Sequence, residues 1–210
     1  MKLVEMTVNT YIDTVASDAP APGGGSASAL CGAQGAGLAT MVAGLTIGKK
    51  KYAEFNDACV EIRDNGTPLV EALKAQIDKD TDAFNLVSAA FKMPKETDED
   101  KKARSAAIQH GTLVSTEVPF ETMTLALDAL RNAKKLLNGF NTNAASDLGV
   151  AALDLLACVK GAWLNVLINI GSLKDTEKAE MFRTQGMAIV KEAEEIANEI
   201  YGEIEKIICQ

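Results

Sequence analysis

Apolar side chains along the chain recur at steps of three and four residues, which is the spacing of one face of an α-helix. One such stripe consists of Leu73, Ile77, Asp80, Phe84, Val87 and Phe91. Another consists of Ile189, Ala193, Ile196, Ile200, Ile204 and Ile207. The second stripe is typical of a helix that packs against a partner helix, within the subunit or across a dimer. Strand-type alternation is scarce, so the pattern predicts an all-α fold.

The stripes and the breaks between them predict a single-domain helical bundle that spans residues 1–210. We expect helices over residues 7–16, 27–47, 52–64, 69–91, 103–138, 144–170 and 176–208. Residues 65–68 predict a break or a kink, with Thr67 as the cap of the next helix and Pro68 at its first position. Pro119 predicts a kink because proline removes a backbone donor. Thr97 and Asp100 have the spacing of a capping box.

Residues 19–48 contain no charged side chain and include the most unusual of these helices. Residues 23–25, all glycine, precede the helix, and Ser26 or Ser28 could cap it. Small residues then recur at every fourth position, at Ser28, Gly32, Ala36, Thr40, Gly44 and Gly48. Because glycine in a helix interior costs about 1 kcal/mol, we expect this face to pack closely against another helix. The run is long enough to span a bilayer, but small residues dilute its apolar ones, so we expect a buried helix and no membrane partner.

Composition and charge narrow the function classes. The chain of 210 residues fits one domain, and its net charge of −8 argues against nucleic acid as a partner. The four cysteines are far apart and form no CxxC pair, which is typical of free thiols in a reducing cytoplasm. No secretory signal is visible, so we expect a cytoplasmic protein. The single histidine, His110, excludes a His-rich metal site. We expect no metal and no cofactor.

Asp80 lies where the first stripe demands an apolar side chain, whereas Asp78 and Asp82 fall on other faces of the helix. Burial of a carboxylate raises its pKa, which suits the group to proton transfer near neutral pH. The alternative is a structural aspartate that binds a helix end or a lysine. We favour the catalytic interpretation.

A line of polar residues crosses the otherwise apolar helix at residues 144–170. It consists of Asp147, Asp154, Asn165 and Asn169. A largely buried helix with one polar seam predicts a lined cavity. The alternative is a hydrogen-bond network between helices.

Two further stretches could bind an anionic ligand, although the GxxxxGK[ST] nucleotide motif is absent. The backbone amides of residues 23–26 open a helix, where N–H groups attract anionic or polar ligand groups. The alternative is a tight turn that lets two helices touch. Lys49, Lys50 and Lys51 form a positive patch at a helix C-terminus. The helix dipole alone favours cations there by roughly 0.3–1 kcal/mol each, so the patch has a structural as well as a substrate-attracting interpretation.

Several of these motifs resemble the cyclodeaminase/cyclohydrolase family of folate enzymes. The matching stretches are Pro20-Ala-Pro-Gly-Gly-Gly-Ser26, Thr46-Ile-Gly-Lys-Lys-Lys-Tyr52, Asp78-Lys-Asp-Thr-Asp-Ala-Phe84, Asn141-Thr-Asn-Ala-Ala-Ser-Asp147, Asn165-Val-Leu-Ile-Asn169 and Ser172-Leu-Lys-Asp175. They occur in the order of the family and cover essentially the whole chain, without a formiminotransferase domain. Phe120 replaces a residue that is often aliphatic in the family, which puts nothing catalytic in doubt.

The resemblance implies an all-helical homodimer whose substrate is a tetrahydrofolate that carries one carbon on N5 or between N5 and N10. A cyclodeaminase closes 5-formiminotetrahydrofolate to 5,10-methenyltetrahydrofolate with loss of ammonia. A cyclohydrolase opens the same methenyl bridge with water to give 10-formyltetrahydrofolate. We favour the cyclodeaminase, and a non-catalytic folate-binding dimer is the remaining alternative.

The resemblance also implies roles for individual residues. Asp80, in the DxDxxAF motif of the family, is expected to be the base or nucleophile, with Asp78 as the alternative. Asp147 and Asn143 are expected to position pterin or bridge nitrogens. The other expected folate contacts are Pro22, Gly23, Gly24, Gly25, Ser26, Lys49, Lys50, Lys51, Asn141 and Asn165.

Overall fold

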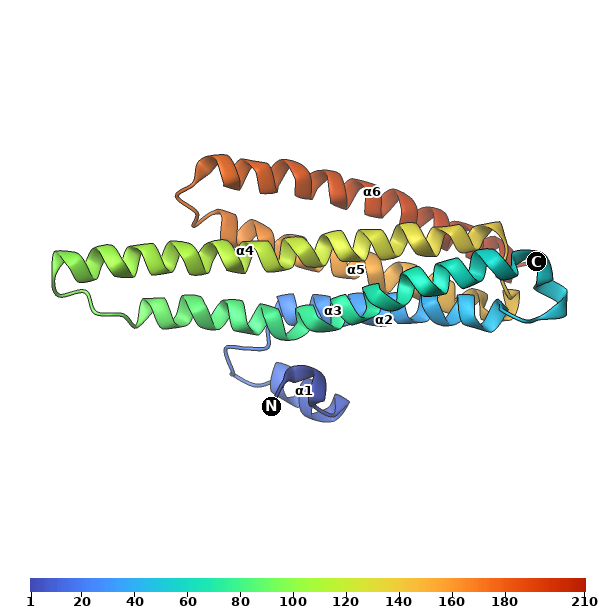
Figure 1. Ribbon diagram of the computed structural model, residues 1–210, viewed down its shortest axis with the longest axis horizontal. Coiled ribbons are helices and arrows are strands. Elements are labelled where there is room, and N and C mark those ends of the chain that lie inside the picture. Colours follow the sequence, from blue (N-terminus) through green and yellow to red (C-terminus); the bar gives the residue numbers. More distant parts are fainter.

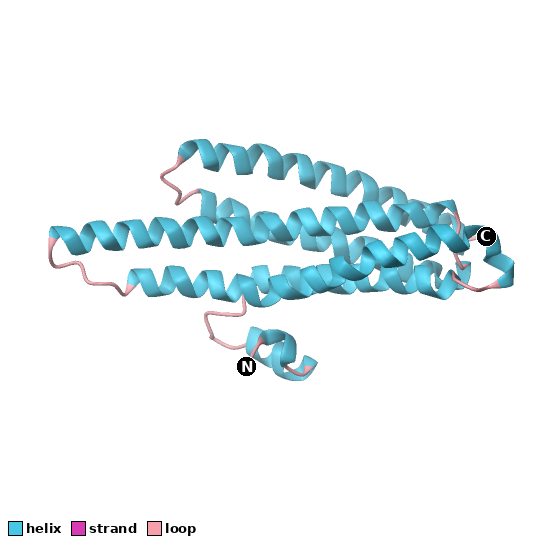
Figure 2. Ribbon diagram, in the orientation of Figure 1, coloured by secondary structure: helices cyan, strands magenta, loops and turns pink.

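The computed structural model describes all 210 residues and contains six α-helices joined by short connections (Figures 1 and 2). The helices are α1 (Val8–Val15), α2 (Gly24–Thr46), α3 (Asn56–Phe91), α4 (Asp98–Lys134), α5 (Ala145–Ile170) and α6 (Thr176–Ile208). Short 3₁₀ segments lie at Leu3–Glu5, Lys50–Phe55, Lys135–Asn138 and Thr142–Ala144. No strand is present, so the all-α prediction is confirmed.

Helices α2 to α6 form an elongated bundle, and α1 lies against its outside (Figure 1). Helix α2 packs between α3 and α5, while α4 contacts α3, α5 and α6. One apolar core runs through these five helices, with Leu73, Leu130, Leu155 and Ile200 fully buried. The isoleucine stripe of α6 contributes to this core, so it packs within the subunit rather than across a dimer. The four cysteines are free thiols, as predicted.

Three of the six α-helices begin at a residue whose side chain caps them, at Thr7, Thr97 and Asp175. The Thr7 side chain accepts a hydrogen bond from the Thr10 amide at the start of α1, and Thr97 and Asp100 form the predicted capping box of α4. The predicted break at residues 65–68 is wrong, because α3 continues through Pro68. Just before this segment, the Asn132 side chain of α4 donates a hydrogen bond to the Ile62 carbonyl at 2.8 Å, which links α3 to α4. Figure 1 shows that α3 bends along its length.

The small residues of α2 permit the close packing that the sequence predicts. A Cβ added to Gly35 would lie 2.8 Å from the Ala151 carbonyl oxygen and 2.8 Å from the Leu155 side chain. A Cβ added to Gly32 would meet the Cys158 side chain at 2.5 Å. Helix α5 therefore approaches α2 more closely than any larger side chain would allow. The prediction is wrong for Gly44 and Gly48, the last two members of the small-residue stripe, because nothing lies within 4 Å of a Cβ at either position. The same is true of Gly37.

The back of the bundle is apolar and uncovered. Helices α2 and α5 lie behind α3, α4 and α6 in Figure 1. Large apolar side chains remain exposed on these two helices at Met41, Leu45, Val150, Leu153, Leu164 and Ile168. By length and composition both helices could cross a membrane, and the core helix of a bundle passes the same test. In this structure 50% of the most apolar window of α2 and 39% of that of α5 are buried. The prediction of a buried α2 therefore holds for the faces toward α3 and α5, not for the outer face.

Substitution of Gly35 tests whether close packing of α2 stabilises the bundle. Gly35→Ala is expected to lower the free energy of unfolding by about 1–3 kcal/mol, because the methyl group would overlap the backbone of α5. Gly202→Ala in α6 is the matched control, since a Cβ there meets nothing within 4 Å. The control is expected to raise stability by about 0.5–1 kcal/mol through helix propensity. Denaturant unfolding measures both, and equal behaviour of the two variants would contradict the close-packing explanation.

Candidate functional site

Asp80 of α3 lies at the N-terminus of α2. The Ser26 backbone N–H donates a hydrogen bond to Asp80 Oδ2 at 2.8 Å, and the Ser26 hydroxyl lies 3.0 Å from the same oxygen. The hydroxyl is also 2.9 Å from the Ile77 carbonyl oxygen, one turn earlier on α3. The first turn of a helix has N–H groups without intrahelical partners and a favourable dipole for a carboxylate. Asp80 therefore caps the N-terminus of α2 and links this helix to α3.

The role of Ser26 differs from the predicted one. Gly23 is the N-cap of α2, and both Ser26 and Ser28 lie inside the helix. The Ser26 side chain binds Asp80 of another helix, and the Ser28 hydroxyl donates to the Gly24 carbonyl at 2.6 Å. Among the three glycines, Gly25 is the one that the contact requires, because a Cβ there would clash with the Asp80 carboxylate.

Burial raises the pKa of the Asp80 carboxyl, and the two hydrogen bonds from Ser26 partly offset the rise. Both bonds reach Oδ2, so Oδ1 keeps its lone pairs free for another proton. The structural alternative, an aspartate that binds a helix end, is thus correct for one oxygen of the carboxylate. The other oxygen is available for chemistry.

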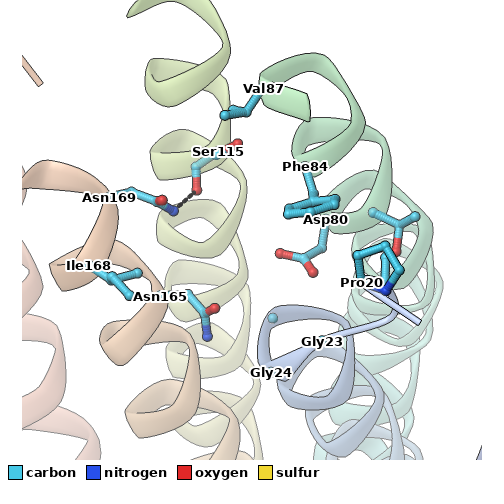
Figure 3. Close-up of a pocket in the computed structure, with 13 residues that line it drawn as sticks. Pro20, Gly23, Gly24, Asp80, Phe84, Val87, Ser115, Asn165, Ile168 and Asn169 are labelled. Atoms are coloured by element: carbon cyan, nitrogen blue, oxygen red, sulfur yellow. Dashed lines mark hydrogen bonds between the residues drawn. The ribbon is translucent and has the colours of Figure 1, made fainter. Parts of the chain in front are cut away.

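Asp80 lines a cavity of about 290 Å³ between the start of α2 and helices α3, α4 and α5 (Figure 3). The lining residues are Pro20, Ala21, Gly23, Gly24, Gly25, Asp80, Thr81, Phe84, Val87, Ser115, Asn165, Ile168 and Asn169. The predicted glycine loop therefore forms one wall of this cavity, and Pro22 lies buried beside that wall, at the cis peptide bond Ala21–Pro22.

Two asparagine amides of α5 face Asp80 across the cavity (Figure 3). Asn165 Nδ2 donates to the Gly161 carbonyl oxygen at 2.9 Å, and Asn169 Nδ2 donates to the Ser115 carbonyl oxygen at 2.6 Å. These bonds fix both side chains and leave their Oδ1 atoms as hydrogen-bond acceptors. The C-terminal half of the predicted polar seam therefore does line a cavity.

The other half of the seam has different surroundings. Asp154 accepts a hydrogen bond from Cys31 Sγ, at 3.3 Å to its carbonyl oxygen and 3.8 Å to Oδ1. Burial raises the pKa of the Asp154 carboxyl, and that of the Cys31 thiol to about 11. Asp147 lies in the first turn of α5, at the end away from Asn165 and Asn169.

Several predicted site residues lie at the opposite end of the bundle from Asp80. The Asn141 backbone N–H donates to Thr46 Oγ1 at 2.9 Å, which places the loop with Asn143 and Asp147 beside the C-terminus of α2. Lys49, Lys50 and Lys51 follow that same C-terminus, and Lys49 and Lys50 line a separate shallow depression. Helix α2 has 23 residues and is therefore about 34 Å long. Within one chain these residues do not share a site with Asp80.

Asp78, the alternative base, has a structural partner. Its Oδ1 accepts a hydrogen bond from the Leu3 backbone N–H at 2.6 Å, which ties the N-terminal segment to α3. It lies on another face of α3 and does not line the cavity of Asp80. The geometry therefore favours Asp80 over Asp78.

The cavity also contains residues to which no site role was assigned from the sequence. Phe84, Thr81 and Val87 continue the Asp80 face of α3, and Ser115 comes from α4. Phe84 and Val87 belong to an apolar stripe that reads as core, and Ser115 has no distinctive sequence context. Asn169 had a signal as a member of the polar seam, and Thr81 and Phe84 lie within the family motif Asp78–Phe84, although no role was assigned to either.

Replacement of the buried charge tests the raised pKa of Asp80. Because the folded state binds the proton more tightly than the unfolded chain, the stability contributed by protonated Asp80 is complete in acid and is lost as pH rises through the raised folded pKa. Asp80→Asn removes this loss, so its melting temperature relative to wild type should increase as pH rises. Asp82→Asn, at an exposed position of the same helix, is the matched control for the loss of one carboxylate. A pH-independent difference for Asp80→Asn would show that the carboxyl has an ordinary pKa.

Comparisons with known proteins identify the family of this chain. The formiminotransferase-cyclodeaminase family model matches residues 7–187. A methenyltetrahydrofolate cyclohydrolase of Methylorubrum extorquens is 38% identical over 93% of this chain and 94% of its own length. The formimidoyltransferase-cyclodeaminases of Gallus gallus and Rattus norvegicus are 31% and 30% identical, and this chain spans only 34% and 38% of their lengths.

A crystal structure of formiminotetrahydrofolate cyclodeaminase from Thermotoga maritima has the same fold. Its TM-score to this chain is 0.79 at 27% sequence identity, over 97% of this chain and 96% of that one. The family match covers most of the helical bundle, including Asp80, the glycine loop and both asparagines of the cavity. The chain therefore belongs to the formiminotransferase-cyclodeaminase family.

Proposed function

We propose that this protein is a folate one-carbon enzyme that closes 5-formiminotetrahydrofolate to 5,10-methenyltetrahydrofolate and releases ammonia. The observation that carries the proposal is Asp80, a carboxylate with a raised pKa and one free oxygen in a cavity at a helix N-terminus. The name of the Thermotoga maritima relative, whose fold covers nearly the whole chain, supports the same reaction.

Asp80 Oδ1 serves as the base and then as the acid. As N10 of the substrate attacks the formimino carbon, the N10 proton moves to Oδ1 and a tetrahedral carbon forms between N5, N10 and the amino group. The proton then passes from Asp80 to that amino group. Ammonia leaves, and the remaining electron pairs form the methenyl bridge. A raised pKa suits a carboxyl group that must both take and return a proton near neutral pH.

The cavity supplies groups that hold the substrate during these transfers. The Oδ1 atoms of Asn165 and Asn169 accept hydrogen bonds from the N–H groups of a pterin. The amides of Gly24 and Gly25, in the first turn of α2, offer donors to its carbonyl oxygen. The reaction moves only protons and electron pairs, so we propose that it needs no cofactor beyond the folate itself. We also propose a cytoplasmic location.

A second candidate reaction is hydrolysis of 5,10-methenyltetrahydrofolate to 10-formyltetrahydrofolate. It is favoured by the 38% identity to a methenyltetrahydrofolate cyclohydrolase along almost the full length of both chains. In that reaction Asp80 takes a proton from water as it attacks the methenyl carbon, and returns it to N5 as the C–N5 bond breaks. The hydroxyl proton of the tetrahedral carbon is released to solvent as the formyl C=O forms, which balances the charge of the methenyl cation. The same residue and the same proton path serve both reactions.

One assay separates the two reactions and tests Asp80. Purified protein receives 5-formiminotetrahydrofolate and, separately, 5,10-methenyltetrahydrofolate, with ammonia release and the methenyl absorbance as readouts. Asp80→Asn is expected to reduce turnover of the active substrate by at least 100-fold, since general acid–base catalysis contributes about 10²–10⁴-fold. Asp78→Asn is the control that should stay active. Folate binding without turnover above the spontaneous rate would identify a non-catalytic binding protein.

We also propose that the protein acts as a homodimer formed through the open face of α2 and α5. This face carries exposed leucine, isoleucine, valine and methionine side chains. The absence of any neighbour around Gly37 and Gly44 supports a second helix at that position, because glycines at exposed helix positions cost stability without a local benefit.

A two-fold dimer of this kind would also explain the separation of the predicted site residues. If α2 of one subunit runs antiparallel to α2 of the other, the C-terminus of one helix lies near the N-terminus of its partner. The lysines at positions 49–51 of one subunit then approach the Asp80 cavity of the other. There they would meet the carboxylates of the folate tail at the cavity mouth, which is the anion contact expected for them.

A charge on the open face tests the dimer. Leu164 is 66% exposed on α5, so Leu164→Glu leaves the core of the subunit intact. It is expected to convert the dimer to a monomer, because a carboxylate buried in an apolar interface loses its hydration. Met187→Glu on the outer side of α6, 52% exposed in the wild type, is the control. Sedimentation of both variants and of the wild type measures the result, and a monomeric wild type would refute the proposal.

A further inference from the structure

Phe84 is the aromatic residue of the cavity, and it is exposed for a geometric reason. It follows Asp80 by one turn on the same stripe of α3, yet 40% of its surface is accessible, against 3% for Ile77 and 0% for Leu73. Helix α2 covers Ile77 and Leu73 but begins at the level of Asp80, where Ser26 binds the carboxylate. Beyond that level α3 and α4 continue without α2 beside them (Figure 1). Phe84 is therefore the first residue of the stripe that no helix covers.

The ring of Phe84 and the carboxylate of Asp80 project side by side from α3 into the cavity (Figure 3). Asp80 is the one ionisable side chain among the thirteen lining residues, so its ionised form gives the cavity a negative charge. The face of a phenyl ring carries a negative quadrupole and attracts cations within about 6 Å of its centre. The two adjacent side chains thus favour a ligand that carries positive charge on a flat group.

The proposed substrates contain such a group. The formimino substituent of one substrate and the methenyl bridge of the other are both planar N–C–N units that carry a positive charge. Tetrahydrofolate has the same pterin but lacks this charged unit. Side chains that interact with this positive charge therefore discriminate between charged and uncharged folates.

We propose that Phe84 binds the cationic N–C–N unit face-on and, together with Asp80, selects charged one-carbon folates over uncharged ones. The inference rests on the proposed folate function and assigns to Phe84 a part of substrate recognition. The cation is present in both the substrate and the product of the cyclisation, so the ring contributes to binding rather than to the chemical step. Its removal should raise KM and leave kcat nearly unchanged.

Two ligands that differ in charge test this proposal. Dissociation constants of 5,10-methenyltetrahydrofolate and of tetrahydrofolate are measured by rapid mixing for wild type and for Phe84→Leu. We expect the variant to bind the cationic ligand about tenfold more weakly, a change of ~1.4 kcal/mol, while its affinity for tetrahydrofolate changes less than twofold. Phe91→Leu, at another exposed phenylalanine of the same helix that does not line the cavity, is the matched control and should leave both constants unchanged.

Site-specific replacement of Phe84 by phenylalanines with one, two and three fluorine atoms keeps the size of the ring while weakening its quadrupole. Affinity for the cationic ligand should fall stepwise along this series, and affinity for tetrahydrofolate should not. Equal losses for the two ligands, or no loss for either, would overturn the proposal. Turnover of the wild type separates this inference from the proposed function. An active wild type whose Phe84→Leu variant loses equal affinity for the two ligands, or none, refutes the cation contact alone. A wild type that neither binds nor converts either folate refutes both.

Discussion

The close approach of α2 to α3 and α5 is the constraint on which the rest of the structure depends. Where two helices touch through glycine, their backbones are held at a distance that no larger residue would permit, as at Gly32 and Gly35. That proximity brings the Ser26 amide within 2.8 Å of Asp80 and the Asn165 amide over Gly24. The glycines of α2 thus act at two levels, as packing positions in the middle of the helix and as walls of the cavity at its start.

Asp80 illustrates how one residue serves fold and chemistry together. A buried carboxylate without partners would be costly, and the first turn of α2 supplies both a hydrogen-bond donor and a favourable dipole. These interactions stabilise the ionised form only in part, because burial still raises the pKa. The balance leaves a group that is held firmly in place by one oxygen and reactive at the other.

Much of this arrangement could be predicted from the sequence, since it depends on local patterns. Helical spacing located the helices, and a charged residue in an apolar stripe identified Asp80. The continuity of α3 through Pro68 could not be predicted, because Thr67 and Pro68 are also the residues typical of a helix start. The exposure of Phe84 could not be predicted either, since it depends on where α2 begins. Family motifs gave the lysines and Asn143 as site residues, but a motif does not say at which end of a bundle, or on which subunit, a residue acts.

The length of α2 determines which chain of a two-fold dimer would contribute which residues to each site. One helix separates Asp80 from the lysines by about 34 Å. In the proposed dimer, each site would therefore take its carboxylate from one chain and its lysines from the other. A mixed dimer of one chain defective at Asp80 and one defective at the lysines would then hold one site with both defects and one site with neither. Two inactive proteins would restore part of the activity on mixing, and the active unit of this enzyme would be the pair of chains.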